Sequence, residues 1–358
     1  MFESTRSQFA HSMRLLGCLF LLTVAGGSVL AAPETVPIGA RPVLDDRYPE
    51  RRTDFPEGVV AYADLTYSEL VGFRPLTLDL YLPPGKRASS PLVVFVHGGG
   101  WQSGHTRHSG AFENWPNVLA SLAAKGYVVA SIEYRLSGEA RFPAAIQDVK
   151  AAIRWLRSRA SQYGIDRQRA VIWGGSAGGQ LAALAAMSCG EAALQPAPPS
   201  SGNTVHPEDK ESDCVQGVIA WYGIFAFATL AKQSAASGPQ APGSTGSAPS
   251  RYLGCALSTC EPAVLAAASP SNYVDANDPP VLLIHGVGDH VVPIQQSRDF
   301  LALLRSKSVR AELIEIPGVD HSFIGANAEA TRAASLQALQ KSMEFLDHSI
   351  GAGRIAKP

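Results

Sequence analysis

The sequence predicts an α/β fold with a mostly parallel central sheet, helices on both faces and an antiparallel edge at the N-terminal side. Across residues 91–316, short β-branched runs typical of strands buried on both faces alternate with helical patterns. Before them, residues 59–67 and 76–82 alternate apolar with polar positions and are separated by a glycine and a proline, which is typical of an antiparallel hairpin. We therefore expect one large domain over residues 58–350.

Composition excludes disorder of the whole chain and argues against a nucleic-acid partner. The chain has 358 residues, of which 46% are hydrophobic, enough for a sizeable core. It carries 30 basic and 31 acidic residues, a net charge of -1, without a basic stripe or an acidic tail. A small or neutral substrate fits this balance better than a polyanion.

Residues 1–31 have the pattern of a secretory signal peptide. A basic segment precedes an apolar run over residues 15–30, and small residues precede Ala31, after which we expect cleavage. A membrane anchor is disfavoured because the run is shorter than the roughly 20 residues that span a bilayer and contains two glycines. Residues 32–57, rich in proline and arginine, are predicted to form an extended arm. We expect a periplasmic or secreted protein with no stable membrane anchor.

Four cysteines follow the predicted signal peptide: Cys189, Cys214, Cys255 and Cys260. Export to an oxidising compartment favours pairing, and neighbours in sequence are the simplest partners. We predict one disulfide between Cys189 and Cys214 and a second between Cys255 and Cys260. The spacing lacks the paired Cys-x-x-Cys or histidine ligands of a zinc site, so no metal is expected.

A run of glycines follows the first buried strand. The β-branched residues 91–96 end in the sequence His-Gly-Gly-Gly-Trp at positions 97–101. Consecutive glycines let backbone N–H groups approach a reacting carbonyl without obstruction by side chains. A merely flexible glycine loop is the alternative, but such loops rarely lie between a buried strand and a tryptophan. We expect His97 to orient this loop.

The alternation of strands and helices continues along the chain. Helical patterns are predicted over residues 112–125 and 142–163, the second beginning near a proline suited to the first turn. Residues 126–132 between them have the composition of a buried strand.

A strand, tight turn and helix at residues 171–184 form the centre of the pattern. Three apolar residues lead into Gly-Gly-Ser-Ala-Gly at positions 174–178, and a Leu/Ala-rich helix follows. This is the Gly-x-Ser-x-Gly nucleophile elbow, in which the sharp turn raises Ser176 above the sheet. The start of the helix also places backbone N–H groups beside any oxyanion formed there. An ordinary glycine-rich turn also fits the pattern, but the flanking motifs favour the elbow.

Two irregular insertions follow the elbow. Residues 189–215 are rich in proline and serine, and residues 231–260 in serine, glycine, alanine and proline, with a strand at 217–223 between them. Neither insertion has the amphipathic pattern of a lipase lid, which argues against a water-insoluble fat as substrate.

The C-terminal part completes the alternation of strands and helices. Strands are predicted at residues 280–284 and 311–316, each followed by a loop, and helices at 294–306 and 333–347.

The two loops supply partners for the serine. A serine hydroxyl needs a base within hydrogen-bond reach, and the base needs a carboxylate that fixes its tautomer. His321 is the only histidine in the loop directly after the last predicted strand, and Asp289 follows the preceding strand. Asp320 is the alternative acid, but neighbouring residues in a turn seldom face each other well. We predict that Ser176, His321 and Asp289 are catalytic.

These motifs together resemble the α/β-hydrolase superfamily. The more specific resemblance is to exported esterases of the feruloyl and acetyl-xylan esterase type, which are related to hormone-sensitive-lipase-like carboxylesterases. It covers about residues 76–323 and implies that the backbone amides of Gly99, Gly100 and Ala177 form the oxyanion hole. The insertions depart from the family pattern, and they lie where substrate specificity is decided.

The resemblance implies an exported serine carboxylesterase without a cofactor, acting on small or aryl/acyl esters through an acyl-enzyme. The alternatives are an amide hydrolase, formamidase-like or a small peptidase, and a non-catalytic binding protein. The ester could be a small molecule or linked to a polysaccharide, and the oligomeric state stays open. Trp101, Tyr222 and Phe225 are candidates to line an aromatic-accepting pocket, although core packing explains such residues equally well.

Overall fold

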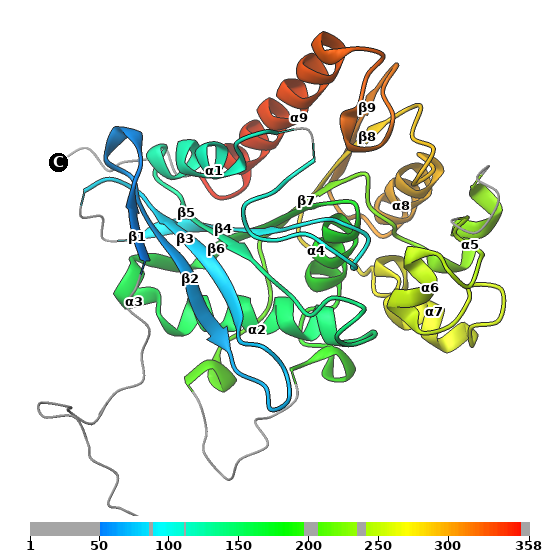
Figure 1. The fold of residues 1–358 in the computed structure, drawn as a ribbon, viewed down its shortest axis with the longest axis horizontal. Helices are drawn as coiled ribbons and strands as arrows, with labels where there is room; N and C mark the ends of the chain where they lie inside the picture. The colour runs from blue at the N-terminus through cyan, green and yellow to red at the C-terminus, as the bar shows by residue number, and fades with distance from the viewer. Residues whose placement is uncertain (1–50, 86–88, 111, 197–206, 235–240, 352–358) are drawn as a thin grey trace, which may run out of the picture. The chain divides into compact units, whose positions relative to one another are not determined.

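The structure is a computed structural model that describes residues 51–85, 89–110, 112–196, 207–234 and 241–351 (Figure 1). The predicted signal peptide and most of the predicted arm lie outside the described residues, as do parts of both predicted insertions. The described end of the arm contains strand β1 (Arg51–Asp54), which pairs with the next strand.

The described strands form one nine-stranded sheet in the order β1-β2-β3-β5-β4-β6-β7-β8-β9. The pairings from β1 to β5 are antiparallel, and those from β5 through β4 to β9 are parallel. The predicted fold class, with its antiparallel N-terminal edge, is confirmed. The strands after β1 are β2 (Val60–Ser68), β3 (Leu76–Leu82), β4 (Ser90–Val96), β5 (Val128–Ile132), β6 (Ile165–Gly175), β7 (Gly217–Trp221), β8 (Val281–Gly286) and β9 (Ala311–Ile316).

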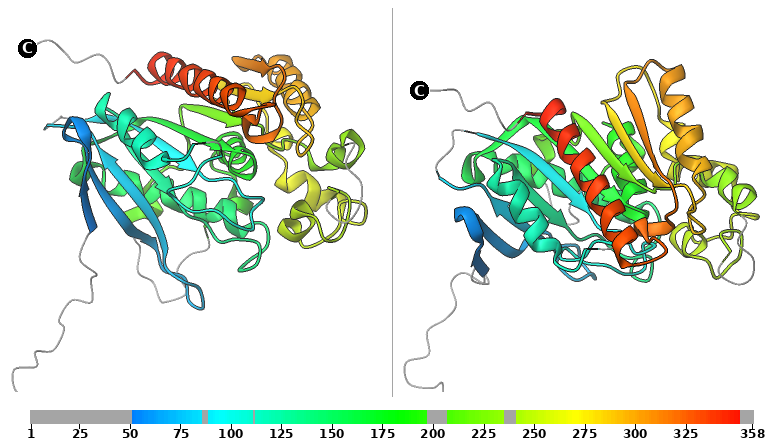
Figure 2. Two further views of the ribbon diagram at one scale, coloured as in Figure 1. Left: turned by 45° about the horizontal axis from the view of Figure 1, so that its top comes forward. Right: turned by 90° about the horizontal axis from the view of Figure 1, so that it is seen from above.

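Helices cover both faces of the sheet (Figures 1 and 2). One face is covered by α1 (Trp115–Ala124) and α9 (Ala328–Ser349), whose apolar residues share one core cluster. The other is covered by α2 (Ala144–Ser158), α4 (Ala177–Met187) and α8 (Gln295–Ser306), which contribute to a second cluster. The shorter helices are α3 (Ala160–Tyr163), α5 (Phe227–Gln233), α6 (Ala248–Leu253) and α7 (Pro262–Ala268).

Strand β4 shows why the continuous apolar runs predict central strands. Successive side chains of a strand point to opposite faces. Leu92, Val94 and Val96 therefore belong to the cluster under α2 and α4, whereas Val93 and Phe95 belong to the cluster under α1 and α9. All seven residues of the strand are buried, and the only polar side chain among them is that of its first residue, Ser90.

Two helices differ most clearly from their predicted limits. The predicted helix 142–163 is interrupted at Arg159, whose φ of -102° and ψ of 18° lie outside the helical region, and it divides into α2 and α3. The last helix begins at Ala328, earlier than predicted, because the Asn327 side chain accepts a hydrogen bond from the Ala330 amide and caps it.

The two disulfides join the predicted partners. Cys189 pairs with Cys214, with Cα atoms 4.8 Å apart, and Cys255 pairs with Cys260 at 5.2 Å. The second insertion is less irregular than predicted, because it contains α6. Among the described residues, no helix combines the length and the apolar character that crossing a membrane requires.

Candidate active site

Ser176 lies at the tip of the turn between β6 and α4. Its φ of 56° and ψ of -123° are strained for a residue with a side chain, and its amide donates to the Trp221 carbonyl oxygen at 2.9 Å. The turn needs small neighbours: a Cβ on Gly178 would lie 2.1 Å from the Val96 carbonyl oxygen. The nucleophile-elbow geometry that the sequence predicts is therefore present.

The glycine loop after β4 lies against this turn. A Cβ on Gly98 would lie 2.8 Å from the Gly175 carbonyl oxygen, so the two loops touch. Gly99 has a φ of 99°, which favours glycine. The Tyr134 hydroxyl donates to the carbonyl oxygens of His97, at 3.1 Å, and Gly98, at 3.3 Å, and thereby holds the loop.

His97 is packed inside the loop. Its ring stacks on Tyr134 with centroids 4.3 Å apart, and its Nδ1 lies 2.8 Å from the Gly98 carbonyl oxygen. Burial lowers the pKa of His97 to about 4, so the ring is uncharged at neutral pH. These contacts fit the predicted part of His97 in orienting the loop.

Ser176, His321 and Asp289 form a continuous hydrogen-bonded chain. The Ser176 Oγ lies 2.9 Å from His321 Nε2, and His321 Nδ1 lies 2.8 Å from Asp289 Oδ2. A carboxylate only accepts, so Nδ1 carries a proton and Nε2 is left to accept from the serine hydroxyl. The three side chains come from the ends of β6, β9 and β8, at one edge of the sheet.

Asp289 is fixed from several sides. Its Oδ1 accepts from the amides of Val291, at 2.9 Å, and Val292, at 2.8 Å. Burial by itself raises the pKa of Asp289, but hydrogen bonds from His285 and His321 outweigh it and hold the pKa below its usual range. The carboxylate therefore stays ionised where a histidine titrates.

His285 is a second histidine beside this carboxylate, and the sequence pattern did not single it out. Its side chain is fully buried, with Nε2 3.2 Å from Asp289 Oδ2 and 2.9 Å from the Val292 carbonyl oxygen. The carbonyl only accepts, so Nε2 carries a proton, while Nδ1 lies 2.7 Å from Ser297 Oγ. A histidine four residues before the acid, at the end of a strand, was the available signal.

The carboxylate of Asp320, the alternative acid, binds backbone amides, whereas the His321 ring donates its hydrogen bond to Asp289. The Asp320 carboxylate accepts from the backbone amides of His321, at 2.6 Å, and His290, at 2.9 Å. It thus caps the turn that carries His321, whereas Asp289 contacts the ring.

Ser176 opens into a cavity of about 570 Å³, here called the serine cavity. Glycine, serine and histidine make up most of its lining, and His105, His108, Val291 and Ser322 are members that were not predicted from the sequence. Each of them follows the glycine loop, Asp289 or His321 by a few residues, and this proximity in sequence is the only feature that could have predicted them. The lining residues are His97, Gly98, Gly99, Gly100, Ser103, Gly104, His105, His108, Ser109, Gly110, Gly175, Ser176, Tyr222, Val291, His321 and Ser322.

Of the aromatic residues expected to line the pocket, only Tyr222 does so, with its ring edge-on to His321 at 4.8 Å. Trp101 is 1% exposed and stacks on Tyr252, and Phe225 is fully buried and stacks on Phe300. Core packing, the alternative explanation, is therefore correct for these two. Within the described ranges, no group of three or more histidine, cysteine or acidic residues could hold a metal ion.

Residues 78–304, more than half of the chain, match the BD-FAE family. The chain belongs to the BD-FAE family. This BD-FAE chain is 33% identical to Esterase LipQ of Mycobacterium tuberculosis (strain ATCC 25618 / H37Rv), over 73% of this chain and 57% of that protein. Esterase LipC of the same organism is 34% identical, over 65% of this chain and 53% of LipC. The BD-FAE chain thus spans about half the length of the curated relatives it matches.

Solved structures share the fold of the BD-FAE chain. A truncated carbohydrate esterase from gut microbiota has a TM-score of 0.65 and 26% identity, over 83% of this chain and 98% of that one. Esterase 2 of Thermogutta terrifontis, solved as the protein phosphorylated by paraoxon, has a TM-score of 0.60 and 26% identity, over 83% and 96% of the two chains.

Proposed function

We propose that the chain is a carboxylesterase that uses Ser176 as its nucleophile. The observation that carries this proposal is the hydrogen-bonded chain from Ser176 through His321 to Asp289, which opens into the serine cavity. The names of the relatives support the bond class, because LipQ and LipC are both called esterases. A binding protein would not need a serine, a base and a buried acid at these distances.

In the proposed mechanism, Ser176 Oγ attacks the carbonyl carbon of the ester while its proton moves to His321 Nε2. The tetrahedral intermediate collapses, His321 returns the proton to the leaving alkoxide, and an acyl-enzyme ester remains on Ser176. Water then attacks this ester with His321 as the base, and the carboxylic acid leaves. Asp289 stabilises the imidazolium form and fixes the ring. The phosphorylation of Thermogutta terrifontis esterase 2 by paraoxon supports covalent chemistry in this fold.

The amides of Gly99, Gly100 and Ala177 are the proposed oxyanion hole. Gly99 and Gly100 line the serine cavity, and Ala177 is the first residue of α4, where an amide has no partner inside the helix. Donors fixed by the backbone need no reorganisation as negative charge develops on the carbonyl oxygen.

Small or carbohydrate-linked esters are the proposed substrates. The serine cavity is lined mostly by glycine, serine and histidine, and among its described lining residues Val291 is the one aliphatic side chain available to contact a long acyl chain. The carbohydrate esterase with a similar fold supports the same class. The same three residue types hydrolyse amides in serine proteases, so amides belong in the test.

Export is part of the proposal. The two disulfides support it, because such bonds persist in oxidising compartments, and the sequence pattern of residues 1–31 agrees.

A substrate panel tests the proposed function. We expect the protein to hydrolyse p-nitrophenyl acetate and butyrate faster than the palmitate ester, and to leave matched anilides almost intact. A fluorophosphonate probe is expected to add to Ser176, located by peptide mass spectrometry, and to spare Ser176→Ala. Hydrolysis of anilides at rates comparable to esters would establish the amide alternative, and absence of both hydrolysis and labelling would reject the proposal.

A further inference from the structure

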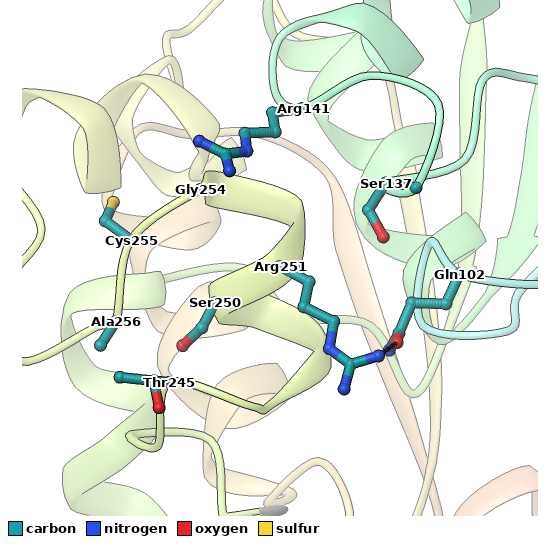
Figure 3. A pocket seen from close by; sticks show the side chains of 10 residues that line it. Gln102, Ser137, Arg141, Thr245, Ser250, Arg251, Gly254, Cys255 and Ala256 are labelled. Atoms are coloured by element: carbon teal, nitrogen blue, oxygen red, sulfur yellow. Dashed lines mark hydrogen bonds between the residues drawn. The ribbon is translucent and has the colours of Figure 1, made fainter. Parts of the chain in front are cut away.

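A second cavity, of about 500 Å³, lies beside helix α6 (Figure 3). Three segments line it: residues that follow β4, residues that follow β5, and the insertion that follows β7. These strands are parallel, so all three segments leave the sheet at the edge where Ser176 lies. We call this cavity the arginine pocket; its lining is Gln102, Ser137, Gly138, Arg141, Thr245, Ser250, Arg251, Gly254, Cys255 and Ala256.

The glycine loop joins the two cavities. Gly100 lines the serine cavity and Gln102 lines the arginine pocket. Between them, the Trp101 carbonyl oxygen accepts from the Ser137 amide at 2.6 Å, and the Trp101 ring stacks on Tyr252 of α6, with centroids 4.4 Å apart. Neighbouring residues of one loop therefore line the two cavities, with the buried Trp101 between them.

Two arginine side chains give the arginine pocket its charge. Both Arg141 and Arg251 are exposed, and none of the ten lining residues in the described chain is acidic. An Arg251 guanidinium N–H donates to Gln102 Oε1 at 2.8 Å (Figure 3). The Arg141 side chain lies against Gly254, where a Cβ would come within 2.6 Å of its Cδ. The pocket thus presents two cations and neutral polar groups.

Carboxylates close to this edge are already paired with other arginines. Glu139, two residues from Arg141, accepts from Arg74 Nε at 2.8 Å and from the Leu136 amide at 2.8 Å. Asp148 is held by Arg135 at 2.7 Å. Glu139 and Asp148 would have to give up these contacts in order to pair with Arg141 or Arg251.

We propose that the arginine pocket binds an anionic group, a carboxylate, on the part of the ester substrate that extends beyond the scissile bond. This inference rests on the proposed function, because it names the substrate class of the same site. Guanidinium groups present planar, fixed arrays of N–H donors that match carboxylate oxygens, and they stay charged at every physiological pH. Acidic sugars and half-esters of dicarboxylic acids have the required chemistry.

The disulfide gives the arginine pocket a fixed wall. Cys255 lines it and is bonded to Cys260, and Gly254, with a φ of 82°, ends helix α6 just before the bridge. The bridge limits the movement of the segment that follows Arg251, so this segment loses less conformational entropy when an anion binds.

Matched pairs of chromogenic esters test the proposal. The anionic series is the p-nitrophenyl half-esters of dicarboxylic acids from succinate to suberate, and the neutral series has acyl chains of the same length ending in methyl. The readout is the ratio of kcat/KM for the anionic over the neutral ester. We expect this ratio to rise at the length that spans from Ser176 to the arginines, and to decrease with added salt.

Substitution of the arginines gives the decisive comparison. In Arg141→Gln with Arg251→Gln, the ratio at the best length is expected to fall about tenfold, as expected for lost hydrogen bonds to a charged group. Arg305→Gln, which removes an exposed arginine of α8 that does not line the pocket, is the matched control and should keep the ratio. An unchanged ratio in the double variant, with hydrolysis of neutral esters intact, would overturn this inference alone.

A binding measurement separates this inference from the proposed function. Calorimetry with Ser176→Ala and each half-ester of the series needs no turnover, and we expect the two arginine substitutions to weaken binding of the tightest one about tenfold. Equal affinity with and without the arginines would reject the pocket even if no ester is hydrolysed. Binding of inorganic phosphate or sulfate, without any preference for the anionic ester, would assign the pocket to free anions and overturn the proposal.

Discussion

The serine cavity and the arginine pocket lie on two sides of one loop, yet they are built from different parts of the chain. Ser176, Asp289 and His321 stand within five residues of a strand end, and their partners include backbone groups and buried side chains. Arg141 and Arg251 come from a loop and from the insertion after β7, and both are exposed.

This difference in construction indicates that the serine cavity determines the rate of the reaction and that the arginine pocket determines substrate preference. The sheet fixes the reacting atoms, so a change there alters the geometry of the transition state and affects kcat. The arginines contribute charge that is partly screened by solvent, so a change there alters discrimination by a smaller factor. If this is correct, substitutions in the serine cavity should lower kcat, and substitutions in the arginine pocket should change the preference for anionic over neutral esters.

Ser176→Ala should have the largest effect. Loss of the nucleophile is expected to lower kcat by about 10⁶-fold, by analogy with serine proteases, while thermal unfolding is unchanged. Binding of the anionic half-ester should persist. Residual hydrolysis within tenfold of the unmodified protein would show that another group attacks the ester.

The two candidate acids give the next largest contrast. Asp289→Asn should lower kcat by about 10⁴-fold with little change in KM, because the amide cannot hold the tautomer of His321. Asp320→Asn removes the charge but keeps an oxygen that can accept from the same two backbone amides, so it should cost less than tenfold. Steady-state kinetics that rank the two variants the other way would reassign the acid.

The pH dependence of neutral-ester hydrolysis should have one acid limb. A proton on His321 Nε2 removes the base, so kcat/KM should fall about tenfold per pH unit on the acid side. Asp289 adds no second proton in this range, because its pKa is held below its usual value. A limb with a slope of two, in protein that circular dichroism shows to be folded, would contradict this assignment.

The buried histidine beside Asp289 should have a moderate effect. His285→Leu removes a donor close to Asp289 Oδ2 and leaves the Val292 carbonyl without its partner. We expect kcat to fall roughly tenfold, with KM nearly constant, and stability to fall by about 2 kcal/mol. His285→Gln, which keeps a donor, should recover part of the kcat. If only the urea midpoint moves and kcat does not, His285 supports the fold and has no part in positioning Asp289.

The smallest effect should come from the bridge beside the arginine pocket. Removing it with Cys255→Ser and Cys260→Ser should cost about 2 kcal/mol of stability and lower the anionic-to-neutral ratio by a few-fold. The matched control replaces Cys189 and Cys214 by serine. It should cost more stability, about 3 kcal/mol by the chain-entropy argument, because the closed loop is longer. The anionic-to-neutral ratio should stay the same in this control, since this bridge does not line the arginine pocket.

The fold class was predictable because its signals are local. Buried strands, the glycine loop and the elbow each show in a few consecutive residues, and parallel strands bring their carboxyl ends to one edge. That is why Ser176, His321 and Asp289 could be chosen before their distances were known. Their catalytic roles stay predictions.

The lining of the cavities was less predictable because it depends on side-chain direction and on distant segments. Trp101 follows the glycine loop directly and has a φ of 56°. Its ring stacks on Tyr252 and does not line the serine cavity. Arg141 and Arg251 are 110 positions apart and line one pocket only through tertiary packing, which no periodicity reveals.

The spread of the three hydrogen-bonded residues along the chain also bears on when activity can appear. Ser176 and His321 are 145 positions apart, and β9, which precedes His321, is an edge of the sheet. Contacts between such distant segments carry a high loop-closure cost and slow the approach to the native state. A chain in which β9 has not yet paired holds a nucleophile without its base. Hydrolysis during refolding should therefore report the docking of this edge, later than signals from helix formation.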